Sequence, residues 1–248
     1  MEFLVQARDV YYQYEDGTKA LDGVNFYLFA GENVALFGAN GSGKTTFALH
    51  LNGLLQGRGE IDVCGMRVGK DTLAAVRSKV GIVFQESDEQ LFMPTVLEDV
   101  AFGPLNLGMN RVDAVVKATR ALGEVGMEYA LDKAPYHLSA GEKKRVALAG
   151  VLAMNPEILV LDEPTTYLDP PGQRSLLQLL HKLPQAKLIV THDVPFAAAL
   201  ATRAVFFEKG KVVADGAVEE IIRRFGWNVS YDSLPADSVL RYSAQRRF

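Results

Sequence analysis

Gly38-Ala39-Asn40-Gly41-Ser42-Gly43-Lys44-Thr45-Thr46 decides the fold of this chain, because it fits the phosphate-loop pattern G-x-x-x-x-G-K-[ST]. The stretch lies between an apolar run at residues 34–37 and a helix-compatible segment at residues 46–54. In the order strand, loop and helix, backbone N–H groups converge on an anion, and the helix N-terminus adds a partial positive charge. We therefore expect all nine residues to line the phosphates of a nucleotide. The alternative is a glycine-rich turn without a ligand.

Two side chains of this loop are suited to a nucleotide that carries Mg²⁺. The ammonium group of Lys44 is expected to reach the β- and γ-phosphates. The hydroxyl group of Thr45 is expected to take a coordination position on Mg²⁺. The loop alone does not say what the nucleotide is used for.

Composition narrows the class of protein. At 248 residues with 48% apolar residues, the chain can bury the core of one large α/β domain, with or without a smaller inserted domain. The net charge is −4 and the basic residues are scattered, which argues against nucleic acid as the main partner. No apolar run approaches the ~18 residues of a membrane span, and no signal peptide is recognised, so we expect a chain that starts in the cytosol. The single cysteine, Cys64, excludes an internal disulfide and is expected to pack among apolar neighbours.

The periodicity predicts an α/β fold with a mostly parallel central sheet, an N-terminal antiparallel β subdomain and an inserted helical subdomain. The main domain is expected over residues 1–228, with the insert at about 86–154 and a surface tail at 229–248. The predicted elements are antiparallel strands at 3–14 and 21–29, strands at 34–37, 59–63, 80–84, 158–161 and 187–190, helices at 111–125, 140–154, 172–183 and 194–201, and a hairpin at 205–214.

Polar side chains follow three of these buried strands. Asp162 and Glu163 end one strand, His192 follows another and Gln85 follows a third. Ligands of open α/β sheets bind at the carboxyl ends of the strands. We expect Asp162 to hold Mg²⁺ opposite Thr45, and Glu163 to be the general base for a water in line with the γ-phosphate; the alternative is an acidic strand-end cap.

His192 and Gln85 are assigned by the same strand-end argument. His192 is predicted to sense the γ-phosphate, although a lone histidine is often structural. Gln85 is predicted to contact Mg²⁺ or the attacking water.

Six motifs occur in the order of a known family. These are the phosphate loop, Gln85, LSAGE (138–142), ILVLDEPT (158–165), YLDP (167–170) and THD (191–193). In this order they resemble an ATP-binding-cassette ATPase over nearly the whole chain. The resemblance implies hydrolysis of ATP to ADP and phosphate with Mg²⁺, in two cassettes clamped head to tail around two ATP molecules.

The resemblance also implies roles for residues outside the phosphate loop. Ser139, Gly141 and Glu142 of one subunit would cover the γ-phosphate held by Lys44 of the other. Asp169 would lie at the dimer seam. Tyr14 would stack on adenine, although it can equally be a strand packing residue.

Three residues depart from the commonest family pattern. Ala140 and Glu142 replace the third and fifth residues of the motif whose usual form is LSGGQ, and Tyr167, outside that motif, is bulkier than the small residue commonly found at its position. Ala140 adds a methyl group where backbone passes closely, and Glu142 adds a charge near phosphate, so rate or affinity is open to change.

Residues 83–92 and 96–108 are similar to energy-coupling-factor importers, and most similar to the cobalt and nickel group. Glu142-Lys143-Lys144 supports that group, because vitamin-uptake relatives tend to have Gln at the first position. The resemblance implies integral membrane coupling and substrate-binding subunits, a peripheral place on the cytoplasmic face of the cell membrane, and Mg²⁺ as the only functional metal of this chain. A vitamin cargo stays open, as do a homodimer, which is simpler, and a paralogous heterodimer.

Two other classes of protein are alternatives to the importer. A soluble cassette ATPase of DNA repair or chromosome organisation usually carries a long heptad insertion, a zinc hook or a basic stripe, and none of these is in the sequence. A regulatory subunit that binds nucleotide without hydrolysis is disfavoured by Lys44, Asp162, Glu163 and His192.

Overall fold

A six-stranded sheet forms the centre of the molecule in the computed structural model, which describes residues 2–226. The predicted tail, residues 229–248, lies outside the described residues. The strand order is β10-β9-β3-β8-β7-β6. The strands are β3 (Asn33–Phe37), β6 (Val80–Val83), β7 (Ile158–Asp162), β8 (Ala186–Val190), β9 (Arg203–Glu208) and β10 (Lys211–Ala217). All neighbouring pairs are parallel except β9 and β10, as the continuous apolar runs predict.

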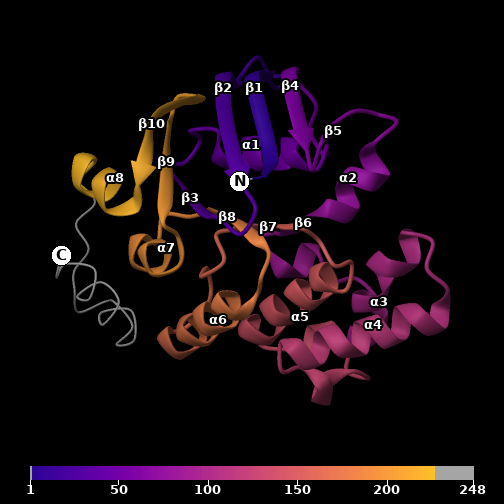
Figure 1. Cartoon of the computed structure of the whole chain (residues 1–248). Helices are drawn as coiled ribbons and strands as arrows, with labels where there is room; N and C mark the ends of the chain where they lie inside the picture. Colours follow the sequence, from indigo (N-terminus) through magenta and orange to yellow (C-terminus); the bar gives the residue numbers. More distant parts are fainter. Residues whose placement is uncertain (1, 227–248) are drawn as a thin grey trace.

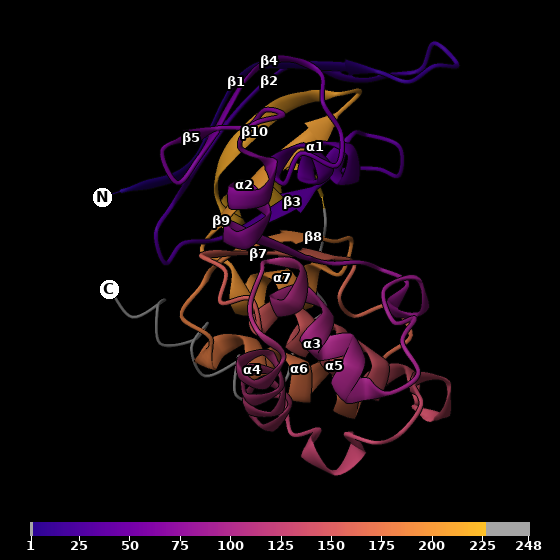
Figure 2. The same ribbon diagram turned by 90° about the vertical axis from the view of Figure 1, so that its right-hand side faces the viewer.

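A second sheet, entirely antiparallel, is built from the N-terminal strands in the order β2-β1-β4-β5. These strands are β1 (Phe3–Gln13), β2 (Lys19–Phe29), β4 (Arg58–Val63) and β5 (Met66–Arg67). Helix α1 (Lys44–Leu51) lies between the two sheets, where its Phe47 ring contacts Phe26 of β2 and Phe207 of β9. Figure 2 shows this sheet and α1 on one side of the central strands.

Helices α3 (Val96–Asn106), α4 (Arg111–Glu124) and α5 (Ala140–Leu152) pack against one another as the helical insert. They lie together on the opposite side of the central strands from the antiparallel sheet (Figure 1). Helix α4 buries Ala114, Ala118, Ala121 and Leu122, which the helical repeat places on one face. A short 3₁₀ turn at Ser87–Glu89 precedes the insert, and two more, at Glu128–Ala130 and Pro135–His137, lie between α4 and α5.

The remaining helices are α2 (Leu73–Lys79), α6 (Pro170–Lys182), α7 (Val194–Leu200) and α8 (Val218–Arg224). The predicted fold class is confirmed, including both sheets and the helical insert. The predicted helix at 46–54 was misplaced, because α1 begins at Lys44 and the chain turns at Gly53 with φ of 68°. Helices α2, α3 and α8 were not predicted individually.

Candidate active site

The phosphate loop joins the end of β3 to the start of α1, as predicted. A Cβ atom at Gly38 would lie 2.2 Å from the carbonyl oxygen of Phe207, and one at Gly43 would lie 2.4 Å from that of Ala20. Both glycines also have positive φ, 142° and 107°. No side chain caps the first turn of α1. Its amide groups therefore face the loop without a side-chain acceptor, which suits a bound phosphate.

Lys44 lies folded over this loop. Its Nζ donates hydrogen bonds to the carbonyl oxygens of Gly38 at 2.8 Å and Ala39 at 3.0 Å. Burial lowers the pKa of the Lys44 ammonium, while the charges of Glu163 and Asp162 oppose this shift. Two carboxylates near a buried ammonium favour its charged form, which can attract phosphate oxygens.

Thr45 and Asp162 meet although they lie on different elements. The Thr45 Oγ1 donates a hydrogen bond of 3.2 Å to Oδ1 of Asp162. Burial raises the pKa of Asp162 to about 6; the Thr45 hydrogen bond opposes this shift and the charge of Glu163 adds to it. A hydroxyl and a carboxylate oxygen are ligands that Mg²⁺ prefers, and a cation would relieve the burial of the two negative charges. The residues present therefore fit Mg²⁺.

Two residues that follow the neighbouring strand β8 make three contacts with the carboxylate of Glu163. Its Oε2 accepts hydrogen bonds from Thr191 Oγ1 at 3.0 Å and from the His192 amide at 3.3 Å, and it lies 2.9 Å from His192 Nδ1. Glu163 has φ of 42°, a strained value that its contacts maintain. The structure thus brings Glu163 and His192 together, with the imidazole 72% exposed.

Thr191 is a site residue that the sequence reasoning missed. It is fully buried, and its hydroxyl both donates to Glu163 and accepts from the Asp193 amide. The signal was present as a hydroxyl residue directly before His192, at the end of an otherwise apolar strand.

Gln85 lies at the same sheet edge. Val83 pairs with Leu161, so Gln85 follows β6 at the level at which Glu163 follows β7. Gln85 is exposed, and its backbone carbonyl oxygen accepts a hydrogen bond of 2.7 Å from Lys144 Nζ. The hydrogen bonds of the described residues do not join Gln85 to Thr45 or Asp162, so its role toward the metal remains a prediction.

Tyr14 lies against the phosphate loop. Its hydroxyl group is 2.9 Å from Thr46 Oγ1, and its ring meets the Tyr12 ring edge to face at 4.9 Å. The side chain is partly exposed, at 38%. Packing in the β subdomain and a surface for adenine are both compatible with this placement, so adenine stacking stays a prediction.

The start of α5 holds the LSAGE residues. Ser139 caps the helix in a reciprocal capping box, because its hydroxyl accepts from the Glu142 amide while Glu142 Oε2 accepts from the Ser139 amide at 2.8 Å. The Tyr129 hydroxyl donates to Glu142 Oε1. These hydrogen bonds, that of Tyr129 first, lower the pKa of Glu142 to about 2. The unusual Glu142 therefore has a local structural use, as an ionised cap.

Ser139 and Gly141 line a hollow of about 290 Å³ together with Leu168. A Cβ atom at Gly141 would meet only the Leu168 side chain, at 3.6 Å, and Ala140 is exposed. Nearby, Asp169 caps α6 by accepting from the Gly172 amide at 2.9 Å. Within the described part of the chain, hydrogen bonds join none of the LSAGE residues to the phosphate loop. The two halves of the predicted site are thus not linked by hydrogen bonds within this part of the chain.

Tyr167 also has a contact that explains its size. Its hydroxyl donates a hydrogen bond of 2.8 Å to Oε1 of Glu86, the residue after Gln85. A small residue at this position could not reach Glu86. The loop after Glu163 is therefore linked to the segment that follows β6.

Residues 2–226 lack two features that bear on function. These residues form no group of three or more His, Cys, Asp and Glu side chains that could hold a metal ion. Over the same range, no helix is both long enough and apolar enough to cross a membrane.

Comparison with known proteins agrees with this geometry. The sequence profile of the ABC transporter family (ABC_tran) matches residues 21–166. The energy-coupling factor transporter ATP-binding protein EcfA of Methanothermobacter thermautotrophicus is 48% identical over 89% of this chain and 73% of its own length. The structure of cbiO1 from Clostridium perfringens, part of the ABC transporter complex cbiONQ, has a TM-score of 0.81 at 33% identity, covering 100% of this chain and 96% of that one. A bacterial ABC transporter cassette solved as a dimer has a TM-score of 0.77 at 29% identity, covering 86% of this chain and 98% of that one.

Proposed function

Because this chain belongs to the ABC transporter family and is an ATPase of that family, we propose that it energises an energy-coupling-factor importer for cobalt or nickel ions. The observation that supports the ATP-hydrolysing part of the proposal is the meeting of Thr45 with Asp162, and of Thr191 and His192 with Glu163, beside the uncapped start of α1. The residues proposed to bind phosphate, to hold the metal and to act as the base are thus neighbours at one sheet edge.

Different residues of this chain carry out different parts of ATP hydrolysis. The amide groups of the phosphate loop and Lys44 bind the phosphates of ATP. Thr45 and Asp162 would hold Mg²⁺, which would supply positive charge to the phosphate oxygens. Glu163 accepts a proton from water as that water attacks the γ-phosphorus atom, and ADP leaves. Thr191 and His192 keep the Glu163 carboxylate in place for this transfer.

Two cassettes are proposed to complete each site. The LSAGE residues of one subunit, at the start of α5, would cover the ATP bound by the other, since no hydrogen bond among residues 2–226 joins them to their own phosphate loop. The exposed Ser139 and the hollow beside Gly141 support this arrangement, as does the dimer of the similar cassette. A homodimer is the simpler form, and a paralogous pair is the alternative.

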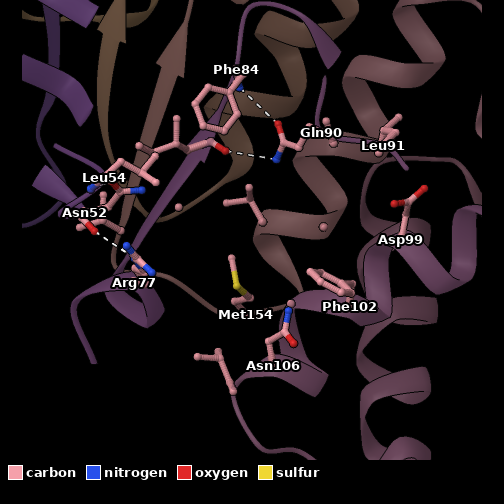
Figure 3. A pocket seen from close by; sticks show the side chains of 18 of the residues that line it. Asn52, Leu54, Arg77, Phe84, Gln90, Leu91, Asp99, Phe102, Asn106 and Met154 are labelled. Carbon is pink, nitrogen blue, oxygen red and sulfur yellow. Dashed lines mark hydrogen bonds between the residues drawn. The ribbon is translucent and has the colours of Figure 1, made fainter. Parts of the chain in front are cut away.

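An apolar groove of about 600 Å³ is proposed to receive a helix from a membrane subunit. The groove runs between the β6 side of the core and the helical insert, and its rim carries the exposed side chains of Leu54 and Phe92. Figure 3 shows Phe84, Gln90, Phe102 and Met154 around the hollow, with Arg77 and Asn52 at one side. Apolar walls that span two packed parts of the chain suit an amphipathic helix whose apolar face is inserted.

The groove is directly connected to the predicted catalytic edge. Gln90 donates to the Ile82 carbonyl oxygen at 3.2 Å and accepts from the Phe84 amide at 3.3 Å (Figure 3). Phe84 lines the groove, and the next residue is Gln85. Movement of a docked helix would therefore shift Phe84 and, with it, the adjacent Gln85. Closure of the cassette dimer on ATP would in turn move the docked helix. This arrangement supports a peripheral place on the cytoplasmic face of the membrane.

The proposal of cobalt or nickel as cargo rests on the Glu142-Lys143-Lys144 pattern. The likeness to cbiO1 of the cbiONQ complex supports a place in an ABC transporter complex, but that description gives no cargo. The relatives named EcfA support the importer type but their names give no cargo. The metal cargo would pass through the membrane subunits, and this chain would supply only the ATP cycle. A vitamin cargo would leave every step described above unchanged.

The test is purification of the chain from native membranes in mild detergent, with identification of the proteins that accompany it. We expect integral membrane subunits, and ATP-dependent uptake of cobalt or nickel when the complex is placed in vesicles. A Lys44→Ala complex is the matched control, since it should assemble but not transport. Uptake of a vitamin instead of metal would change the cargo, and a preparation with only soluble or nucleic-acid partners would overturn the importer.

A further inference from the structure

Lys144 is a buried lysine whose side chain leaves α5 and reaches the segment that follows β6. Its Nζ donates hydrogen bonds to the carbonyl oxygens of Phe84 at 3.1 Å and Gln85 at 2.7 Å. Only 3% of the residue is exposed. Burial of an ammonium group is unfavourable unless it is paired, so these two contacts identify a specific attachment of the helix to this segment.

The attachment lies where the sheet no longer holds the chain. The last pair between β6 and β7 joins Val83 to Leu161, so the carbonyl groups of Phe84 and Gln85 lie beyond the ladder. Lys144 supplies donors to both. Burial lowers the pKa of the Lys144 ammonium group, and attraction to the negative charges of Glu86 and Asp162 opposes this shift.

The same helix carries Ser139 at its start. Ser139 caps α5, and Lys144 lies within the next two turns of that helix. An α-helix transmits displacement along its axis because its backbone hydrogen bonds hold the turns together. A shift of the Ser139 end would therefore move the carbonyl oxygen of Gln85 through the Lys144 side chain.

We propose that Lys144 is a positioning residue that fixes Gln85 to helix α5 and thereby couples the two ATP sites of the cassette dimer. This inference rests on the proposed function, in which Ser139 covers the partner's ATP and Gln85 serves its own subunit's Mg²⁺. ATP held in one site then sets the position of Gln85 in the other. Hydrolysis is fast only when both sites are filled.

The neighbouring Lys143 offers a matched control. It extends from the same helix to the same segment, where its Nζ pairs with Asp88; the Lys143 side chain is 17% exposed and the Asp88 side chain 72%. An ion pair with one solvent-exposed partner contributes little to stability. Lys143→Met therefore removes a lysine contact without removing the buried donors of the Gln85 carbonyl.

The experiment measures ATP turnover of the purified complex as a function of ATP and Mg²⁺, for the natural chain and for Lys144→Met, Lys144→Gln and Lys143→Met. For the natural chain we expect a Hill coefficient above about 1.5, because two coupled sites allow values up to 2. Lys144→Met should lower the maximal rate about tenfold, bring the Hill coefficient to about 1 and raise the Mg²⁺ concentration needed for half-maximal rate. Lys143→Met should stay within about twofold of the natural chain.

Lys144→Gln keeps an N–H donor without the charge, so it should recover part of the rate and the cooperativity. It also keeps the test decisive if Lys144→Met does not fold, which thermal unfolding of each variant would show. If the natural chain is cooperative and the folded Lys144 variants keep the same Hill coefficient, the role of Lys144 is overturned while the paired sites stand. A natural chain with a Hill coefficient of 1 would overturn the paired sites, and the coupling with them.

Discussion

The two halves of the candidate site are held in different ways. In the phosphate-loop half, Asp162, Glu163 and Thr191 are at most 9% exposed, and they come from the ends of strands buried in the central sheet. In the LSAGE half, Ser139 is exposed at a helix start, and Tyr129, which contacts Glu142, is 58% exposed. The phosphate-loop half is therefore fixed by folding of the central sheet. The LSAGE half relies on the local hydrogen bonds among Ser139, Glu142 and Tyr129, and on the partner subunit that is proposed to cover it.

The largest expected effect lies in the buried half. Glu163→Gln should lower kcat by about 100-fold or more, because the amide cannot accept a proton from water. ATP binding should persist, since the amide oxygen of glutamine can still accept from Thr191. Steady-state phosphate release and equilibrium ATP binding measure the two effects.

Glu208→Gln, on the exposed end of β9, is the control for Glu163→Gln and should leave kcat unchanged. Turnover of Glu163→Gln within a few-fold of the natural rate would contradict the assignment of Glu163 as the base.

The second effect concerns the strand that supports Thr191. Lys187, near the start of β8, is buried, and its Nζ donates to the carbonyl oxygens of Leu183 and Gln185. Burial lowers the pKa of Lys187 to about 8 from 10.5. Between these two values the unfolded chain binds more protons than the folded chain, so the unfolding free energy should rise with pH. Relative to Lys187→Met, the natural chain should gain roughly 1–2 kcal/mol between pH 8 and 10.

Denaturant unfolding at a series of pH values measures this difference between slopes. Lys182→Met, an exposed lysine at the end of α6, should keep the slope of the natural chain. Equal slopes for the natural chain and Lys187→Met would show that Lys187 is charged throughout this pH range.

The smallest effect is expected in the exposed half. Glu142→Ala removes the carboxylate that accepts from the Ser139 amide and from Tyr129, and should lower the unfolding free energy by about 1 kcal/mol. It should also lower turnover by a few-fold, since Ser139 loses its fixed orientation. Thermal unfolding and phosphate release measure both changes.

Glu142→Gln separates the cap from the charge. Its amide oxygen can still accept from Ser139, so stability and turnover should stay near those of the natural chain. A loss in Glu142→Gln as large as in Glu142→Ala would show that the negative charge, and not the cap, is what the site uses.

Much of the fold followed from local patterns. Continuous apolar runs predicted the central strands, and alternation predicted the antiparallel pair, because these periods report which faces are buried. Helix α3 was not predicted individually, since Gly103 and Pro104 interrupt its helical pattern; its start is fixed by the Thr95 cap. Helices α2 and α8, each of seven residues, are too short to show a clear period.

The sequence by itself determined which residues are candidates for the chemistry of the site. The phosphate loop, the carboxylates after β7 and the histidine after β8 are short patterns, and parallel strands bring their ends to one edge of a sheet. Only the tertiary structure decided which side chains from distant parts of the chain hold these strand ends in place. Lys144 reaches Gln85 across 59 residues of chain and Tyr167 reaches Glu86 across 81, and such pairs leave no periodic signal in the sequence. They form because packing of α5 and of the loop after Glu163 against the end of β6 leaves backbone and carboxylate groups that only a long polar side chain can satisfy.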